Sequence, residues 1–472
     1  MSGMPETAGK GGDSGGSAVA DAVRCWPRRR GLAVVCGGGP AWGWTVLGEP
    51  RGVLTVGSRG STWTGEGEAA FAVGRGVLAD MRSALEWGKK QSREAAPETG
   101  PLGSGWVVSL SYELGGEIEP AARRRGPDGS WPLIVMQRMV GPRVFDHARG
   151  VWDGALPRED EGAAGFRGFR IGELRSEMGQ ASYEGAVARG IEYIHAGDVY
   201  QVNLAHRLVG SFSGSTREAF AALVESARPW HGAYMECAAD RVLRAENGKR
   251  AIMSASPELF LKVEGRRVVT RPMKGTWPGS RDPAELRESG KDRAELNMII
   301  DLMRNDLGRV CRFGTVKVED ARAIERHGEQ RAKSPRAKGP HSEEGGVWQG
   351  VGTVVGELRA GVDVVNLLAA AFPAGSVTGA PKIRAMQIID ELEVSGRGPY
   401  CGSIGWIGDD GRVCLNVAIR TALVRARVWK GEPDWIEDGE ISYSVGAGIV
   451  AESVPRREWE ETMQKAGVIR GV

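Results

Sequence analysis

The chain has none of the cysteine patterns that mark a disulfide framework or a cysteine-ligated metal centre. Its six cysteines are scattered over 472 residues, without a Cys-x-x-Cys pair. Secreted domains that depend on disulfides are small and dense in cysteine, so this scatter predicts reduced thiols and a cytoplasmic protein. Long apolar runs are missing too, because none approaches the roughly 20 residues that a membrane-spanning helix needs.

An excess of one charge is also missing. The formal net charge is +2, and this balance predicts neither a nucleic-acid partner nor a membrane-surface partner. The first residues lack the basic start and apolar block of a signal peptide. Their glycine, serine and alanine content instead predicts a disordered tail over residues 1–22.

Composition divides the rest of the chain into two parts. Residues 23–170 are short apolar runs broken by glycine and proline, without a catalytic signature, and are predicted to form an N-terminal lobe of the scaffold. Residues 171–472 contain the candidate chemistry. Within them, residues 321–346 are rich in Arg, Lys, Glu and Gly and contain two prolines, which predicts a mobile surface insertion.

One lysine stands in an unusual local context. Strand-forming residues at 268–270 lead into Pro272, which favours the end of a strand, and Gly275 lets the chain bend away. Lys274 is therefore expected at a strand-to-loop junction. A lysine held there can be desolvated, which would free its amine to act as nucleophile or base. A solvated lysine paired with a carboxylate is the ordinary alternative.

A glutamate upstream could pair with this lysine. Residues 251–261 predict two strands that meet at Ser256-Pro257, and Glu258 follows the break between apolar neighbours. A carboxyl group in such surroundings is a candidate for a raised pKa, although a carboxylate that points to water is the simpler interpretation. Glu258 and Lys274 are expected on adjacent strands, an arrangement that would allow an acid/base pair.

Two predicted helices each carry a pair of acidic residues three positions apart. Asp292 and Glu295 share one face of a long helix predicted over residues 283–311, beside an apolar stripe. Glu458 and Glu461 have the same spacing in the last predicted helix. Two such pairs facing each other would make an all-oxygen site suited to Mg²⁺. An ordinary exposed charged face is the alternative.

Three further features favour an anionic ligand. The glycine-rich loop at residues 372–382 feeds a helix whose first N–H groups suit an anion, and it does not match a nucleotide-binding pattern. Arg420 is expected on a small, uncharged face of one long strand over residues 413–428, where it would need an anion if buried. Glycines at 446 and 448, after the final strand, would let backbone N–H groups approach a ligand.

Several long motifs, in the same order, resemble those of the chorismate-utilising enzymes. This family includes component I of anthranilate synthase, component I of aminodeoxychorismate synthase, and isochorismate synthase. The resemblance covers roughly residues 175–470 and is carried by residues 291–309, by the loop at 373–382, and by residues 446–448 with the helix after them. It implies an α+β fold with two packed β-sheets and helices on the outside.

The resemblance also implies roles for the candidate residues. Glu295 and Glu461 would hold Mg²⁺ directly, with Asp292 and Glu458 acting through water, and the metal would bind the ring carboxylate of chorismate. Lys274 and Glu258 would be catalytic. The implied substrate-binding residues are Gln201, Thr378, Tyr400, Arg420, Gly446, Ala447 and Gly448.

Three positions distinguish the members of this family. Relatives that add water carry a lysine base where this chain has Gln201, and a neutral amide cannot deprotonate water. Aminodeoxychorismate synthases carry Lys274, whose amine would add to C2 of chorismate before ammonia adds at C4, whereas anthranilate synthases have a small residue there. Gln349 replaces the histidine that serves pyruvate elimination in anthranilate synthases. The expected product therefore keeps its enolpyruvyl group.

The expected reaction is conversion of chorismate and ammonia to 4-amino-4-deoxychorismate, on the route to 4-aminobenzoate and folate. A separate glutamine amidotransferase subunit would supply the ammonia, because no cysteine of this chain stands in a nucleophile-elbow context. One alternative is component I of anthranilate synthase. Another is a non-catalytic relative that binds chorismate only, since fold alone never fixes activity.

Overall fold

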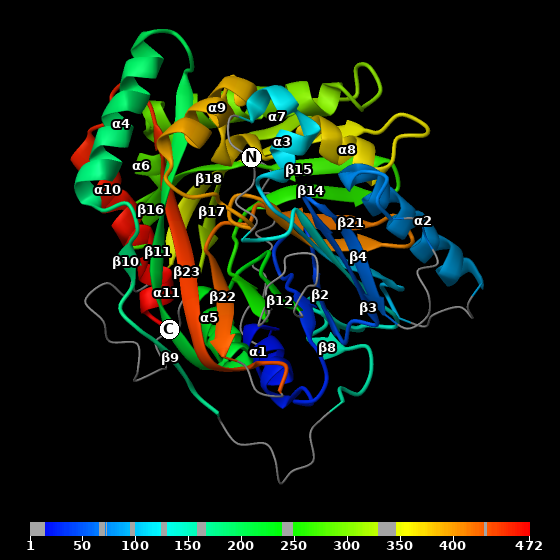
Figure 1. The fold of residues 1–472 in the computed structure, drawn as a ribbon. Coiled ribbons are helices and arrows are strands. Elements are labelled where there is room, and N and C mark those ends of the chain that lie inside the picture. Colours follow the sequence, from blue (N-terminus) through cyan, green and yellow to red (C-terminus); the bar gives the residue numbers. More distant parts are fainter. Residues whose placement is uncertain are drawn as a thin grey trace, which may run out of the picture.

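The computed structural model describes residues 15–65, 71, 73–94, 100–123, 130–157, 167–237, 249–328, 346–428 and 432–472. In these ranges two large antiparallel β-sheets form the body of the molecule, and helices lie on their outer sides (Figure 1). This arrangement confirms the expected α+β fold of two packed sheets with helices outside.

The larger sheet has 12 strands in the described residues. They are β1 (Ala33–Val35), β2 (Trp44–Gly48), β7 (Arg143–Asp146), β8 (Val151–Trp152), β9 (Phe169–Ile171), β10 (Arg175–Ser176), β11 (Gln201–Ser215), β12 (Ala233–Cys237), β13 (Arg250–Ser254), β19 (Gly379–Ala380), β22 (Thr421–Val428) and β23 (Trp435–Ile449). Their order is β10-β11-β23-β22-β13-β12-β1-β2-β7-β8, with β9 and β19 also paired to β11.

The smaller sheet has 11 strands in the same part of the chain. They are β3 (Gly52–Gly57), β4 (Gly60–Gly65), β5 (Gly105–Leu110), β6 (Ile134–Met139), β14 (Leu259–Glu264), β15 (Arg267–Arg271), β16 (Met273–Pro278), β17 (Lys317–His327), β18 (Val347–Glu357), β20 (Ser403–Gly408) and β21 (Val413–Asn416). Their order is β16-β18-β15-β14-β21-β20-β5-β6-β3-β4, and β17 pairs with β18.

The helices of the described residues connect and cover these sheets. They are α1 (Gly15–Cys25), α2 (Val77–Glu94), α3 (Leu114–Ile118), α4 (Gln180–His195), α5 (Thr216–Ala227), α6 (Pro283–Glu288), α7 (Gly290–Gly308), α8 (Val364–Ala371), α9 (Lys382–Leu392), α10 (Pro455–Lys465) and α11 (Gly467–Arg470), with 3₁₀ turns η1 (Pro120–Ala122) and η2 (Gly375–Val377). Within the described ranges, none of these helices combines the length and apolar character needed to cross a bilayer.

The two sheets pack against each other through an apolar layer to which both contribute. Val35 and Ile252 come from the larger sheet, Val107 and Trp406 come from the smaller one, and all four side chains are buried. Both sheets also take strands from before and after residue 170. The predicted boundary between a lobe at 23–170 and a catalytic region at 171–472 therefore does not separate two structural units.

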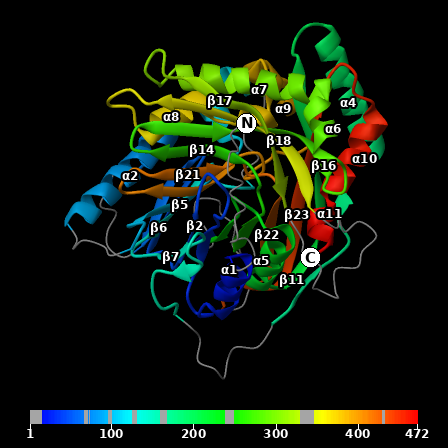
Figure 2. The same ribbon diagram turned by 180° about the vertical axis from the view of Figure 1, so that it is seen from behind.

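Separate groups of helices cover the outer faces. α4 and α10 pack on each other and cover β11 and β23, at the left in Figure 1. α7 packs across β16, β17 and β18, at the top of the reverse view in Figure 2. The candidate site forms between these two groups, where β16 of the smaller sheet meets β23 of the larger one.

Two predictions of disorder are wrong for the residues that the structure describes. Residues 15–22 belong to α1, which buries Val19 and Val23 and packs on α5. A composition rich in small residues concealed this apolar face. Residues 321–327 belong to β17, so the predicted insertion at 321–346 begins as a paired strand. Residues 1–14 and 329–345 lie outside the described ranges.

Two long elements predicted from periodicity are each broken in the structure. The helix predicted over residues 283–311 is divided at Ser289, whose hydroxyl accepts a hydrogen bond from the Asp292 N–H and so starts α7. The strand predicted over residues 413–428 crosses from one sheet to the other between β21 and β22. Arg420 has a φ of 50° at this crossing, so the proposed single face with Asn416 and Ala418 does not exist.

Candidate active site

Lys274 lies inside a strand rather than at a strand-to-loop junction, so that prediction is wrong. It is the second residue of β16, and Pro272 separates β15 from β16. Gly275, with a φ of 76°, lies at a register shift in the pairing of β16 with β18. The Lys274 side chain is 15% exposed, and its Nζ lies 3.3 Å from Oε2 of Glu295 on α7. The amine is thus held at the boundary between the two sheets.

Gly448 and Gln201 of the larger sheet border this amine. A Cβ built on Gly448 would lie 2.5 Å from Lys274 Nζ and 3.0 Å from Gln201 Nε2, so any other residue here would displace the amine from this position. Gln201 is fully buried, and neither its Nε2 nor its Oε1 has a hydrogen-bond partner. Buried polar groups are nearly always paired. Gln201 is therefore not the satisfied strand residue that the sequence favoured, and its amide is placed to meet a ligand.

Glu258 lies beside the same lysine but reaches it by an unexpected path. It directly precedes β14, which is separated from β16 by β15 and β18, so the prediction of adjacent strands is wrong. β14 pairs Leu259 with Arg271, which places Glu258 beside the Pro272 link that leads to Lys274. The two residues meet because the chain turns from β15 into β16 at this point.

Burial raises the pKa of Glu258 to about 7, against the lowering effects of the Ser376 hydroxyl, the Lys274 charge and the Met273 backbone N–H. The side chain is only 4% exposed. Ser376 donates a hydrogen bond to Oε1 across 2.6 Å. A carboxyl group with a pKa near neutrality can both give and take a proton at physiological pH. The environment of Glu258 thus has the properties that the sequence anticipated.

The acidic residues of α7 and α10 face one region. Glu295 is 4.0 Å from Lys291 Nζ as well as 3.3 Å from Lys274 Nζ. Glu461 forms an ion pair of 2.8 Å with Lys465. Burial acts to raise the pKa of Glu461, but Lys465, Lys274 and Lys291 together lower it. Because Lys274 and Lys291 act on carboxylates of both helices, the two helices present their acidic faces to the same space.

The other two acidic residues complete this cluster. Burial raises the pKa of Glu458, and repulsion from Glu461 adds to the rise. The Asp292 carboxylate packs on Gly275, where a built Cβ would lie 3.0 Å from its Oδ1. Within the described residues, no three metal-binding side chains lie close enough to hold an ion as they stand. The donors are nonetheless carboxylate oxygens that repel one another and attract ammonium groups, which fits a hard divalent cation.

The segment 446–448 lies inside β23 rather than after it. Its two glycines nevertheless leave backbone N–H groups open to a ligand, as the sequence suggested. On β11, the Asn203 N–H donates to Thr378 O and the Ala205 N–H donates to Glu393 Oε1, so these two residues direct their backbone groups away from β23. Their partners Gly448 and Gly446 must then direct their own N–H groups away from β11. β22 accompanies β23 only as far as Tyr443, which leaves this edge to the site.

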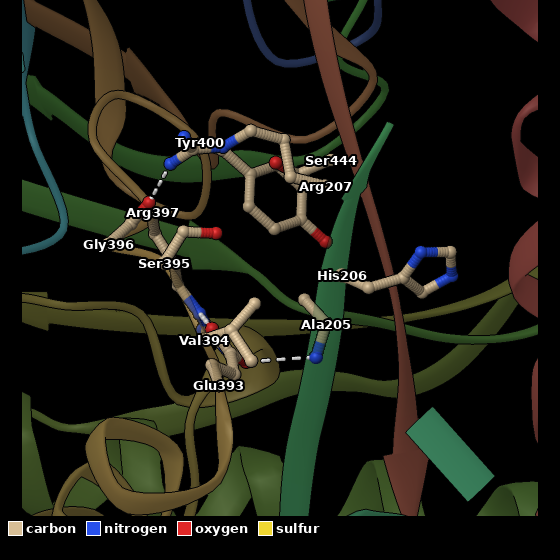
Figure 3. Close-up of a pocket in the computed structure, with 10 residues that line it drawn as sticks. All are labelled: Ala205, His206, Arg207, Glu393, Val394, Ser395, Gly396, Arg397, Tyr400 and Ser444. Carbon is tan, nitrogen blue, oxygen red and sulfur yellow. Dashed lines mark hydrogen bonds and ion pairs between the residues drawn. The ribbon is translucent and has the colours of Figure 1, made fainter. Parts of the chain in front are cut away.

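Tyr400 lies on the face of the larger sheet that carries Gly446, and Thr378 lies at the edge of β11, where its carbonyl accepts from the Asn203 N–H. A Cβ built on Gly446 would lie 3.1 Å from Tyr400 Oη, and residues 446 and 448 share one face of the strand. The Thr378 hydroxyl donates to Ala374 O at 3.1 Å. A pocket continues this face past Tyr400, with Ala205 and Ser444 among its lining residues (Figure 3).

Arg420 is placed less directly. It is half-buried at the crossing between the sheets. After burial, its charge is the largest cause that lowers the pKa of His327, and it opposes the rise that burial causes in the pKa of Tyr443. The guanidinium charge therefore acts within this buried region. Its contact with a substrate carboxylate remains a prediction.

One important residue, Arg397, was missed from the sequence. Its guanidinium is buried and donates to Asn203 O at 2.7 Å, to Val377 O at 2.8 Å and to both carboxylate oxygens of Glu393. Arg397 therefore fastens the loop that carries Thr378 to the strand that carries Gln201. An arginine in a Gly-Arg-Gly-Pro turn gives no periodic signal, so only the structure could reveal this role.

Comparison with known proteins agrees with this geometry. A family model described as chorismate binding enzyme matches residues 64–471. Aminodeoxychorismate synthase component 1 of Escherichia coli (strain K12) is 38% identical over 449 residues, 90% of this chain and 88% of that protein. Anthranilate synthase component 1 of Aquifex aeolicus (strain VF5) is also 38% identical, over 299 residues, 62% of this chain and 53% of that protein.

Among solved structures, anthranilate synthase component I from Streptococcus pneumoniae TIGR4 superimposes with a TM-score of 0.67 at 21% identity, covering 93% of this chain and 92% of that one. This similarity concerns the fold. With a family match over most of its length, the chain belongs to the chorismate binding enzyme family.

Proposed function

We propose that the chain is the chorismate-converting component of an aminodeoxychorismate synthase. The observation that carries this proposal is the Lys274 amine, which lies in the space left by Gly448, beside the unpartnered amide of Gln201. An ion-paired structural lysine would not need a glycine opposite it or an unsatisfied amide beside it. A lysine that forms a bond to a substrate needs both the space and polar groups that the substrate can satisfy.

In the proposed reaction Lys274 first releases its ammonium proton to solvent. The free amine then attacks C2 of chorismate, the ring double bonds shift, and the C4–O bond breaks. The departing hydroxyl takes a proton and leaves as water. Glu258 in its acid form is the proton donor, because it lies beside Lys274 and has a pKa of about 7. Ammonia then attacks C4, the double bonds shift back, and the C2–N bond to Lys274 breaks. The Glu258 carboxylate accepts the proton released from the added ammonia.

The remaining site residues bind and orient the substrate. Asp292, Glu295, Glu458 and Glu461 are the residues that would hold Mg²⁺, which when bound would neutralise them and hold the ring carboxylate of chorismate. Tyr400 and the Gly446 and Gly448 N–H groups would bind the enolpyruvyl carboxylate, with Arg420 and Thr378 assisting. Gln201 offers an amide and no base, which disfavours addition of water.

Ammonia would come from a glutamine amidotransferase subunit, and the product would serve 4-aminobenzoate and folate synthesis in the cytoplasm. Support for the partner comes from the relatives, which are named as component 1 of their synthases. The chain's own six cysteines are consistent with it, because five of them are buried and a glutaminase nucleophile must be reached by its substrate.

The second candidate is anthranilate synthase component I, because the Aquifex relative is as similar in its matched part as the Escherichia coli one. A product assay separates the two. Purified protein with chorismate, Mg²⁺ and ammonium should form 4-amino-4-deoxychorismate, and 4-aminobenzoate should appear only after a lyase is added. Anthranilate formed without a lyase would contradict the proposal. No turnover with saturating ammonium would instead favour a relative that only binds chorismate.

A further inference from the structure

The main chain of Glu258 is fixed independently of its side chain. The Ser256 hydroxyl accepts a hydrogen bond from the Glu258 N–H at 3.2 Å and donates to Val417 O at 2.6 Å. The Val417 N–H returns a hydrogen bond of 3.1 Å to Glu258 O. These contacts fix the Cα of Glu258 but leave the rotation of its carboxyl group open. That rotation decides which oxygen faces Lys274.

Two groups hold the carboxyl itself. One is the Met273 backbone N–H, and the other is the hydroxyl of Ser376, 2.6 Å from Oε1. Only the second is a side chain that substitution can remove. Ser376 is buried and stands in η2, two residues before Thr378. This short turn is fastened in turn to β11, through Thr378 O and the Asn203 N–H.

The charged and titratable neighbours of Glu258 come from two other elements. Lys274 reaches it from β16, and Cys401 faces it from the turn before β20. Burial raises the pKa of the Cys401 thiol to about 12, so that group stays neutral. Lys274 is the one cation acting on Glu258 among these neighbours, and it is a flexible chain that must move during the reaction. It cannot fix the carboxyl in one orientation.

We propose that Ser376 is a positioning residue that orients the Glu258 carboxyl toward Lys274 and ties this orientation to the packing of the 372–382 loop on β11. The inference rests on the proposed role of Glu258 as the acid and base of the reaction. It assigns a task to a hydroxyl that no sequence motif singled out. It also explains why the loop that carries Thr378 is bound to two separate parts of the site.

The direct test is isotope-edited infrared spectroscopy of the Glu258 carboxyl, which needs no turnover. The band is assigned as the one missing in Glu258→Gln. In Ser376→Ala it should titrate about one pH unit higher than in the wild type, because a hydroxyl that donates to a carboxylate favours the ionised form. Ser376→Thr keeps the hydroxyl and should restore the wild-type midpoint. An unchanged midpoint in Ser376→Ala would overturn the proposal.

Kinetics give a second readout and separate this inference from the proposed function. In Ser376→Ala, kcat should fall by about tenfold with little change in KM for chorismate, because a misdirected acid affects the reaction more than binding. In a Glu258→Gln background the same substitution should have no further effect. Equal losses in both backgrounds would contradict the positioning role. A wild type that forms no aminodeoxychorismate would refute the proposed function, while the infrared result would still stand.

A matched control addresses simple loss of stability. Ser61→Ala removes another serine hydroxyl that donates to a buried carboxylate, that of Asp80, at the contact between β4 and α2. It should change the melting temperature without moving the Glu258 titration. If Ser61→Ala moved that titration as much as Ser376→Ala does, the Ser376 effect would be a general loss of rigidity.

Discussion

Two lysines of the catalytic region are equally shielded from water and yet are held in opposite ways. The side chains of Lys274 and Lys382 are 15% and 14% exposed, respectively. Lys382 Nζ is 2.6 Å from Asp306 Oδ2 and 2.7 Å from Ala371 O, so it has short contacts with two oxygens of the protein. Lys274 has one longer ion pair, at 3.3 Å. Burial alone therefore does not mark a reactive lysine.

The surroundings explain the difference. Burial lowers the pKa of Lys382 against the attraction of Asp306, and burial raises the pKa of Asp306. That pair is a buried structural contact between α7 and the start of α9. Lys274 instead faces the Cα of Gly448 and an amide whose polar atoms are unpartnered. Oxygens of the protein thus bind the Lys382 amine closely, whereas the Lys274 amine is left accessible to a substrate.

The largest expected effect comes from removing the reactive amine. Lys274→Met keeps the length of the side chain but cannot attack chorismate, so turnover should fall by about 10⁴-fold or more. The melting temperature should fall by less than in Lys382→Met, since Glu295 keeps a second ammonium group, that of Lys291, at 4.0 Å. Steady-state assay and thermal melting of the same preparation check both statements. If Lys274→Met turned over within tenfold of the wild type, Lys274 would not be the nucleophile.

Lys382→Met tests whether the second lysine of this comparison is structural. It leaves the buried Asp306 without its cation, which should cost about 3–5 kcal/mol of unfolding free energy. Denaturant unfolding measures this loss. Adding Asp306→Asn should recover part of it, because the stranded charge is then gone. A stable Lys382→Met protein with no turnover would reverse the assignment of the two lysines.

Glu258→Gln should reduce turnover by about 10³-fold, because the amide cannot transfer a proton. It should also change how stability depends on pH. The pKa of Glu258 is raised from 4.5 to about 7 in the folded protein, so the folded state holds a proton that the unfolded chain loses between these values. Wild-type stability is therefore lost as pH rises through this window.

The corresponding measurement is a pair of melting curves at pH 5 and pH 8. Glu258→Gln carries no charge to bury, so relative to the wild type it should be more stable at pH 8 than at pH 5. A constant difference between the two proteins would show that Glu258 is already ionised at the lower pH. In that case its use as a proton donor would be excluded.

The smallest of these effects concerns the space over Gly448. In Gly448→Ala the new Cβ would lie 2.5 Å from Lys274 Nζ, and the displaced amine should lower kcat by about 10²-fold. Gly467→Ala is the control, because nothing lies within 4 Å of its Cβ position. Equal activity of the two variants would mean that the amine does not work from this position.

Much of this architecture was accessible from the sequence. Strand-forming residues predicted β13, β14 and β15, and acidic residues at helical spacing predicted α7 and α10. The predicted lengths of two elements were wrong. Periodicity gives no sign of the point at which a strand passes from one sheet to the other. The run through Arg420 keeps alternating across the crossing, and the helix pattern continues through Ser289 although that residue starts a new helix.

The sequence singled out only some of the candidate site residues, and the reason differs from the one that limited the fold prediction. Lys274, Glu258 and the four acidic residues stand in recognisable local contexts. The structure pairs Lys274 with Glu295 and brings its charge to act on Glu258 and Glu461. Ser376 and Arg397 act through contacts between segments far apart in the chain, which no local pattern encodes. The unpartnered state of Gln201 was likewise invisible, because a strand residue's hydrogen bonds depend on what the opposite sheet offers.

The most direct test of the account is intact-protein mass spectrometry after mixing the chain with chorismate and Mg²⁺ without ammonia, followed by rapid quenching and peptide mapping. The account predicts a covalent adduct equal to chorismate less one water, located on Lys274 and absent from Lys274→Met. An unmodified Lys274 in a protein that turns over chorismate normally once ammonium is added would contradict it.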